Sequence, residues 1–137
     1  MGEASNDALN LLILAAANGD VEKISILLNR VDVNQLSDDG LTPLMQAAVY
    51  GHAESIRALL QANADPNLAG RDGWTPLMLS VQYGHLDIVT ALVVAGANPN
   101  QSNDEDWLPL MAAIAGNYTT LLVNILLKSG ADPNLGD

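Results

Sequence analysis

The chain has 137 residues, 49% of them apolar, and no cysteine. This composition suits one domain with a continuous core, excludes disulfides, and fits a reducing intracellular location, cytoplasmic or nuclear. The apolar runs fall short of the roughly 18 residues of a membrane span. The formal charge of −11 disfavours nucleic acid and anionic membranes and favours basic partners, although acidity also serves solubility alone.

The rare residues recur at a fixed spacing. Pro43, Pro76 and Pro109 are 33 residues apart, as are the two tryptophans and the two histidines. A period of this length indicates a repeat architecture, in which each unit buries its apolar face against the next. We expect a single domain over residues 1–137 with repeats at about 4–36, 37–69, 70–102 and 103–137.

The first unit, LLILAAANGDVEKISILLNRVDVN, is an irregular copy of the later ones. It lacks the Thr-Pro start that the second and third units share, and it is one residue shorter in its second half. A terminal repeat needs a polar outer face, which Asn6, Asp7 and Asn10 are placed to supply. We therefore expect this unit to be an N-terminal cap.

The second and third units each predict two short helices. Thr42 is a candidate N-cap, and Pro43 follows at the first helical position, where its missing N–H costs nothing. Gly51 ends the first helix, and the apolar positions around Leu59 give the second helix its buried face. Neither helix is long enough to be stable alone, so stacking must stabilise both. The turn-rich segment from ADPN to DG suits a projecting hairpin.

The fourth unit departs from this pattern. Asp106 stands where the earlier units have a turn glycine, and it tolerates a left-handed backbone better than most residues, so the turn should survive with lower stability. Leu108 replaces the capping threonine and cannot form the cap bond. The last helix, TTLLVNILLK, is apolar on more than one side. We expect that this end is covered by further repeats of a longer protein or by a partner.

The TPLM, YGH and GADPN-type segments, in register over nearly the whole chain, resemble the ankyrin repeat. The resemblance implies an all-α repeat solenoid of stacked helix–turn–helix repeats with projecting β-hairpin or loop fingers. Methionine replaces the family's TPLH histidine in three units, so thioether packing is expected in place of imidazole hydrogen bonds.

The sequence offers no set of catalytic residues. It has no glycine-rich phosphate loop, and His52 and His85 occupy matched positions in adjacent units, which favours structural roles. The acidic run at 103–106 lacks the residue spacing of a calcium loop. We expect no enzyme activity, no metal and no cofactor.

In ankyrin-type stacks, the resemblance implies that partners bind a concave face lined by the fingers and the first helices. The matching positions flank the turn glycine and precede the Gly-His break. They are Asp38, Asp39, Leu41, Val49 and Tyr50 in the second unit, Arg71, Asp72, Trp74, Gln82 and Tyr83 in the third, and Asp104, Glu105, Trp107, Ala115 and Gly116 in the fourth.

These positions hold every aromatic residue except Tyr118, and Asp39, Asp72 and Glu105 form an acidic ladder with one rung per repeat. Exposed tryptophan is enriched in binding hot spots. Repeats lie about 8–10 Å apart and an extended peptide advances about 3.3 Å per residue. We therefore expect a protein–protein interaction module that binds a peptide with Lys or Arg roughly every three residues and an apolar residue between them.

Other interpretations remain open. In one of them, the acids are ordinary turn residues and the tryptophans cover neighbouring hairpin backbone. The chain also fits a structural spacer or docking arm of a larger protein, with the open C-terminal repeat as its interface. Tryptophan with carboxylates also suits a cage for methylated lysine, which needs two or three converging rings. A selected or designed binder is a further alternative, against which the irregular repeats argue.

Overall fold

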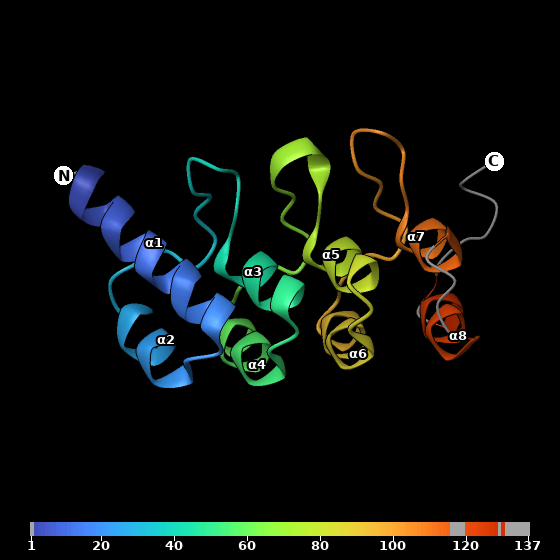
Figure 1. The fold of residues 1–137 in the computed structure, drawn as a ribbon, viewed down its shortest axis with the longest axis horizontal. Helices are drawn as coiled ribbons and strands as arrows, with labels where there is room; N and C mark the ends of the chain where they lie inside the picture. The colour runs from blue at the N-terminus through green and yellow to red at the C-terminus, as the bar shows by residue number, and fades with distance from the viewer. Residues whose placement is uncertain (1, 116–119, 129, 131–137) are drawn as a thin grey trace.

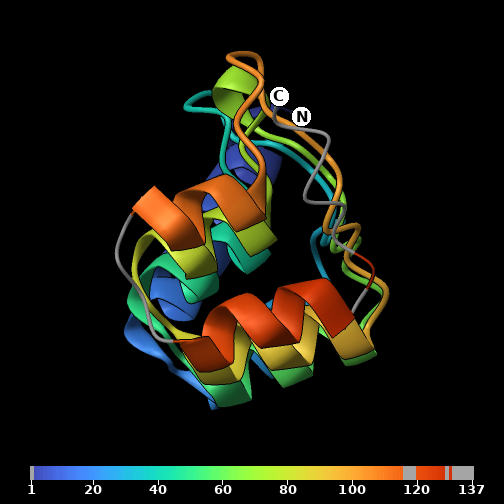
Figure 2. The ribbon, with the colours of Figure 1, turned by 90° about the vertical axis from the view of Figure 1, so that its right-hand side faces the viewer.

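The computed structural model describes residues 2–115, 120–128 and 130, with the side chains of residues 2–6, 112, 114, 115, 121 and 122 excepted. The helices of this part of the chain are α1 (Gly2–Asn18), α2 (Val21–Leu27), α3 (Pro43–Tyr50), α4 (Ala53–Gln61), α5 (Pro76–Gln82), α6 (Leu86–Val94), α7 (Pro109–Ala115) and α8 (Thr120–Lys128), with one 3₁₀ turn, η1 (Arg71–Gly73). Consecutive helices pair, and the pairs stand in a row (Figure 1). Viewed along that row, α3, α5 and α7 form one layer and α4, α6 and α8 a second (Figure 2). The predicted all-α repeat solenoid is confirmed.

Local sequence determines where α3 and α5 begin and where α3 ends. Thr42 Oγ1 accepts a hydrogen bond from the N–H of Met45 at 3.2 Å, with Pro43 at the start of α3. The same cap recurs at α5, where Thr75 accepts from Met78 at 3.2 Å. The helix α3 ends at Gly51, whose φ of +74° lies in the left-handed region that glycine adopts without a steric cost. The predicted caps and break are confirmed.

One hydrophobic core runs through the stack. It extends from Leu12 in α1 to Leu126 in α8, so every helix pair buries its apolar face against a neighbour. Met45 and Met78 are each only 1% exposed, which confirms that thioether packing replaces the signature histidine. Burial between repeats, rather than within one repeat, stabilises these short helices.

Hydrogen bonds also join successive repeats through the loops that follow α2, α4 and α6. Asn67 donates from Nδ2 to the carbonyl of Gly96 at 3.1 Å and accepts the N–H of Asn98 at 2.6 Å. Asn34, 33 residues earlier, makes the equivalent pair of bonds to the next loop. His85 Nε2 lies 2.9 Å from the carbonyl oxygen of Val49 and donates to it, since that oxygen only accepts. These side chains link repeats, in agreement with a structural role for the histidine.

Three fingers project from the row between helix pairs (Figure 1). We name them by their closing backbone bonds: the first finger is 37–41 (Ser37 N–H to Leu41 O, 2.9 Å), the second 70–74 (Gly70 to Trp74, 2.8 Å) and the third 103–107 (Asn103 to Trp107, 3.0 Å). No strand occurs in the ranges that the structure describes, so the fingers are loops and not β-hairpins. Asp106 adopts φ +64°, which confirms that aspartate replaces the turn glycine there.

The N-terminal end of the row differs from expectation. Asp7 and Asn10 are exposed as predicted, while Asn6 lies outside the described side chains. Leu11, Leu14 and Ile26 are also exposed, at 54%, 55% and 61%, so the predicted polar cap is incomplete.

At the other end, Leu126 is buried, Val123 and Ile125 are partly buried, and Leu127 is 39% exposed. The side chains of Leu121 and Leu122, on which the prediction of an open last helix also rested, lie outside the described part.

Candidate partner-binding groove

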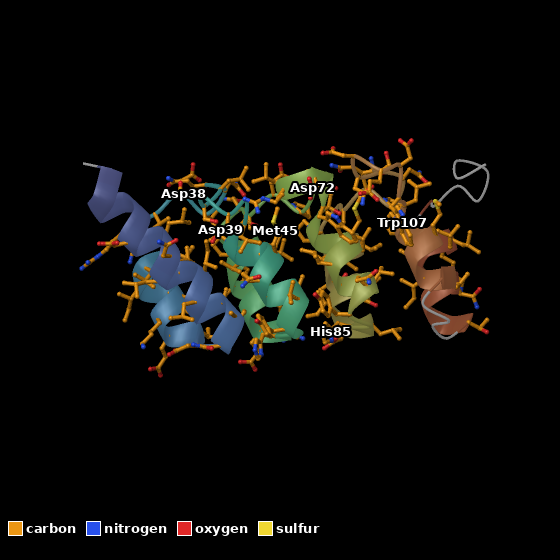
Figure 3. The ribbon with its side chains drawn as sticks, turned by 45° about the horizontal axis from the view of Figure 1, so that its top comes forward. Asp38, Asp39, Met45, Asp72, His85 and Trp107 are labelled. Carbon is orange, nitrogen blue, oxygen red and sulfur yellow. The ribbon has the colours of Figure 1, made fainter. Side chains whose placement is uncertain are left out.

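Two adjoining hollows run along the bases of the three fingers. The larger, of about 400 Å³, lies between the first and second fingers, and the smaller, of about 250 Å³, lies between the second and third. Both are lined by Asp72, Trp74 and Gln82, so they form one continuous surface, which we call the groove. Figure 3 shows Asp39, Asp72 and Trp107 following one another along this side of the molecule, with His85 away from them.

Backbone bonds between fingers hold this surface together. The N–H of Arg71 donates to the carbonyl of Gly40 at 3.2 Å, and the N–H of Asp104 donates to the carbonyl of Asp72 at 3.0 Å. Within the third finger, Asn103 is buried and its Oδ1 accepts the N–H groups of Glu105 and Trp107, each at 2.9 Å. Each finger is therefore fixed both internally and against its neighbour.

Gly70 sets how closely the first two fingers approach. A Cβ at this position would collide with the carbonyl oxygen of Gly40 and lie 2.9 Å from the thioether of Met45. The absence of a side chain lets the second finger lean onto the first, directly over the buried Met45, which forms the floor of the larger hollow. Figure 3 shows Met45 next to Asp39.

The aromatic residues have different surroundings. Trp74 is partly buried and lines both hollows. Trp107 lines the smaller hollow and also packs against the hydrophobic core, so it serves the fold as well as the groove. Tyr83 lines the larger hollow and is 55% exposed. Tyr50 is 57% exposed and lines neither hollow.

The charged residues are mostly acidic and exposed. Asp39, Asp72 and Glu105, the predicted ladder, all line the groove. Asp38 and Asp104 are exposed on the same fingers but line neither hollow. Leu41 lines the larger hollow, as do Gln82 and the guanidinium-bearing Arg71. The larger hollow thus combines an apolar wall, two carboxylates and one basic residue.

Several lining residues were not predicted. Met45 and Leu79 reach the larger hollow, and Asn103 reaches the smaller one. Leu79 precedes Gln82, the last residue of α5, and its C-cap Tyr83 by three and four residues. This helical spacing puts all three on one face, so the sequence did carry a signal for Leu79. Of the remaining predicted positions, Val49 is partly buried, the side chain of Ala115 is not described, and Gly116 lies outside the described residues.

A family model described as ankyrin repeats (3 copies) matches residues 2–70 and 62–137. The chain belongs to the ankyrin repeat family. This family is a non-enzymatic interaction fold. Within the part that the structure describes, no group of three or more His, Cys, Asp or Glu is arranged to hold a metal ion, and no helix is both long and apolar enough to cross a membrane.

Curated ankyrin repeat relatives match over part of the chain. Cortactin-binding protein 2 of Oryctolagus cuniculus is 46% identical over 61 residues, 43% of this chain. The ankyrin repeat and KH domain-containing protein 1 of Homo sapiens is 47% identical over 57 residues, 41% of this chain. The chain spans only 4% and 2% of the lengths of these two proteins. The similarity therefore concerns the repeats and not the rest of either relative.

A further hollow, of about 310 Å³, opens on the outer face of the first ankyrin repeat. Leu11, Leu14 and Ile26 line it together with Lys23. When Gly19 is aligned with Gly51, the adjoining Leu27 corresponds to Leu59, which is fully buried in the next repeat. Leu27 is only partly buried, so the first repeat covers this position less completely than the next repeat does.

Proposed function

We propose that this ankyrin repeat domain binds an extended, basic and apolar segment of a partner protein in the groove. The observation that carries the proposal is the continuity of the two hollows: they share Trp74 and Asp72 and cross all three fingers. A binding surface with aromatic anchors in its centre and charges around them has the composition of a protein-interaction hot spot. We infer no catalytic activity, since the groove residues do not include a nucleophile paired with a base.

The charges on the fingers support a basic ligand. The fingers carry six carboxylates, Asp38, Asp39, Asp72, Asp104, Glu105 and Asp106, against the single guanidinium of Arg71. This field attracts Lys and Arg side chains and repels phosphate, so we propose a protein ligand and no nucleic acid. We place the interaction inside the cell, in a reducing compartment, in keeping with a chain that has no cysteine and therefore no disulfide. Cortactin-binding protein 2 is itself named for a protein partner, in keeping with such a ligand.

The test is selection from an unbiased peptide library on the wild-type domain, repeated with Trp74→Ala. Trp74 is the suitable anchor to remove, because Trp107 also packs against the core and its loss would change folding as well. We expect enrichment of peptides that carry Lys or Arg around an apolar residue, at spacings that are multiples of about three residues. The variant should lose these peptides. A library that enriches nothing, or one enriched equally by Trp74→Ala, would contradict the proposal.

A docking arm is the second candidate function. The apolar hollow on the outer face of the first repeat favours it, as does Leu127 of α8, which is 39% exposed at the other end of the row. In this case, a larger assembly would cover one end, and Leu14→Asp or Leu127→Asp would disrupt capture by the assembly, while Trp74→Ala would not. The library selection and these variants separate the two functions.

A reader of methylated lysine is a minor alternative. Trp74 and Tyr83 line the larger hollow with Asp39 and Asp72, a set that suits a methylammonium group. Arg71 lines the same hollow, and its charge opposes a cation there. A peptide pair that differs only in lysine trimethylation distinguishes a cage, which prefers the methylated form, from a groove that ignores it.

A further inference from the structure

Arg71 is the one basic side chain that lines either hollow of the groove. Its N–H is bonded to the carbonyl of Gly40, and its Cβ is so close to that glycine that a Cβ on Gly40 would lie 2.9 Å away. The side chain therefore starts from a fixed point at the boundary between the first and second fingers.

The guanidinium is available to a ligand. Arg71 is exposed, and within the described part of the chain it takes part in no ion pair, although Asp39 and Asp72 line the same hollow. A guanidinium presents a planar fork of N–H donors that matches a carboxylate with two parallel hydrogen bonds. A carboxylate is therefore the ligand group that this guanidinium suits.

The charges along the groove follow an order. The first finger carries Asp38 and Asp39, the second combines Arg71 with Asp72 and is neutral, and the third carries three acids, at 104–106. The field is thus strongly negative at the ends of the groove and weak in its centre. A uniformly basic ligand would bring a cation against Arg71, and like charges brought together oppose binding.

We propose that the groove selects a basic–acidic–basic charge sequence, with a charge at about every third residue, and that Arg71 selects the central carboxylate. The spacing follows from repeats about 8–10 Å apart and a peptide that advances about 3.3 Å per residue. This inference rests on the proposed function, because it specifies the ligand of the same groove. Arg71 is a specificity-determining residue in this account, and Trp74 remains the apolar anchor beside it.

Three synthetic peptides test the proposal: Lys-Thr-Leu-Glu-Thr-Ser-Lys and its variants with Gln or Lys in place of the central Glu. Titration of the full chain with each fluorescently labelled peptide gives the three dissociation constants. We expect the Glu peptide to bind roughly tenfold more tightly than the Lys peptide, because its central residue forms an exposed ion pair with Arg71, whereas the central Lys is repelled by it. The Gln peptide should lie between them.

The variant Arg71→Glu should reverse this order, so that the Lys peptide binds most tightly. Arg57→Glu is the matched control, because Arg57 is an exposed residue of α4 that lines a separate hollow, and its substitution changes the net charge equally. The control should keep the wild-type order. Trp74→Ala should weaken all three peptides alike.

The outcomes separate the inference from the proposed function. If the peptides bind and Trp74→Ala weakens them, but the central residue makes no difference or Arg71→Glu leaves the order unchanged, the charge sequence is wrong and the groove stands. If none of the three peptides binds, or if Trp74→Ala has no effect on them, the groove itself is wrong. A reversal of order by Arg57→Glu would also overturn the inference, because net charge would then explain the preference.

Discussion

Tyr50 and Tyr83 form a natural matched pair for testing the limits of the groove. They stand 33 residues apart at the same position of successive repeats and are exposed to nearly the same degree, 57% and 55%. Only Tyr83 lines the larger hollow. Tyr83→Ala should therefore weaken ligand binding, while Tyr50→Ala should not, even though repeat register alone treats the two residues as equivalent.

The magnitude follows from the exposed area. A tyrosine side chain offers about 200 Å², and Tyr83 leaves 55% of its surface exposed, so a ligand that covers half of the exposed part buries about 50 Å². At about 25 cal/mol/Å², this burial contributes about 1.3 kcal/mol, or roughly tenfold in affinity. The effect of Tyr50→Ala should stay within about twofold.

The assay is a fluorescence titration of the selected peptide with the wild type and both variants, accompanied by thermal unfolding. Both rings are more than half exposed, so neither variant should lower the melting temperature appreciably. Tyr83→Phe, which keeps the ring, should retain most of the affinity. Equal losses for Tyr50→Ala and Tyr83→Ala would refute the assignment of the site to the two hollows, and no loss for either would refute the estimate of ring burial.

Three further predictions concern charge and stability. Raising NaCl from about 0.05 to about 0.5 M should weaken peptide binding roughly tenfold; an affinity independent of salt would contradict the electrostatic account. Ser55 is fully buried, and its hydroxyl has no hydrogen-bond partner in the described part of the chain, so Ser55→Ala should stabilise the fold by about 1 kcal/mol in thermal unfolding. Ser80→Ala, which removes a 2.8 Å bond to a helix carbonyl, should not. Gly51→Ala brings a Cβ to 2.7 Å from the His85 ring at φ +74°, whereas Gly96→Ala meets open space at φ +100°. Gly51→Ala should therefore lower the free energy of unfolding more than Gly96→Ala. Equal losses for the two variants in chemical denaturation would contradict the contact with His85.

Much of the fold could be predicted because the repeated residues determine the backbone conformation of their immediate neighbours. Thr42 with Pro43 predicts a helix start, Gly51 predicts its end, and Asp106 predicts a left-handed turn, and each depends on the backbone of a few neighbouring residues. The face exposed by the first repeat was not predicted. Its polarity depends on which sides of α1 and α2 face away from the second repeat. The first unit departs from the pattern of the later repeats, so that pattern did not show which of its residues are exposed.

The groove was predicted only as a set of positions. Register places Asp39, Asp72 and Trp74 on one face, but it does not show how far one finger leans on the next. That approach depends on Gly70, whose missing side chain admits the carbonyl of Gly40, and it decides which residues share a hollow. Tyr50 lines neither hollow, although its register matches that of Tyr83.

The central claim is that a partner segment lies along the groove. The chain has two tryptophans, Trp74 and Trp107, and both line it, so their indole N–H resonances in an NMR titration with the selected peptide report on the groove directly. We predict that both resonances shift and saturate together, while the backbone resonances of Leu11, Leu14 and Ile26 stay in place. Saturating shifts confined to those three residues or to α8, with both indole signals unmoved, would contradict the account.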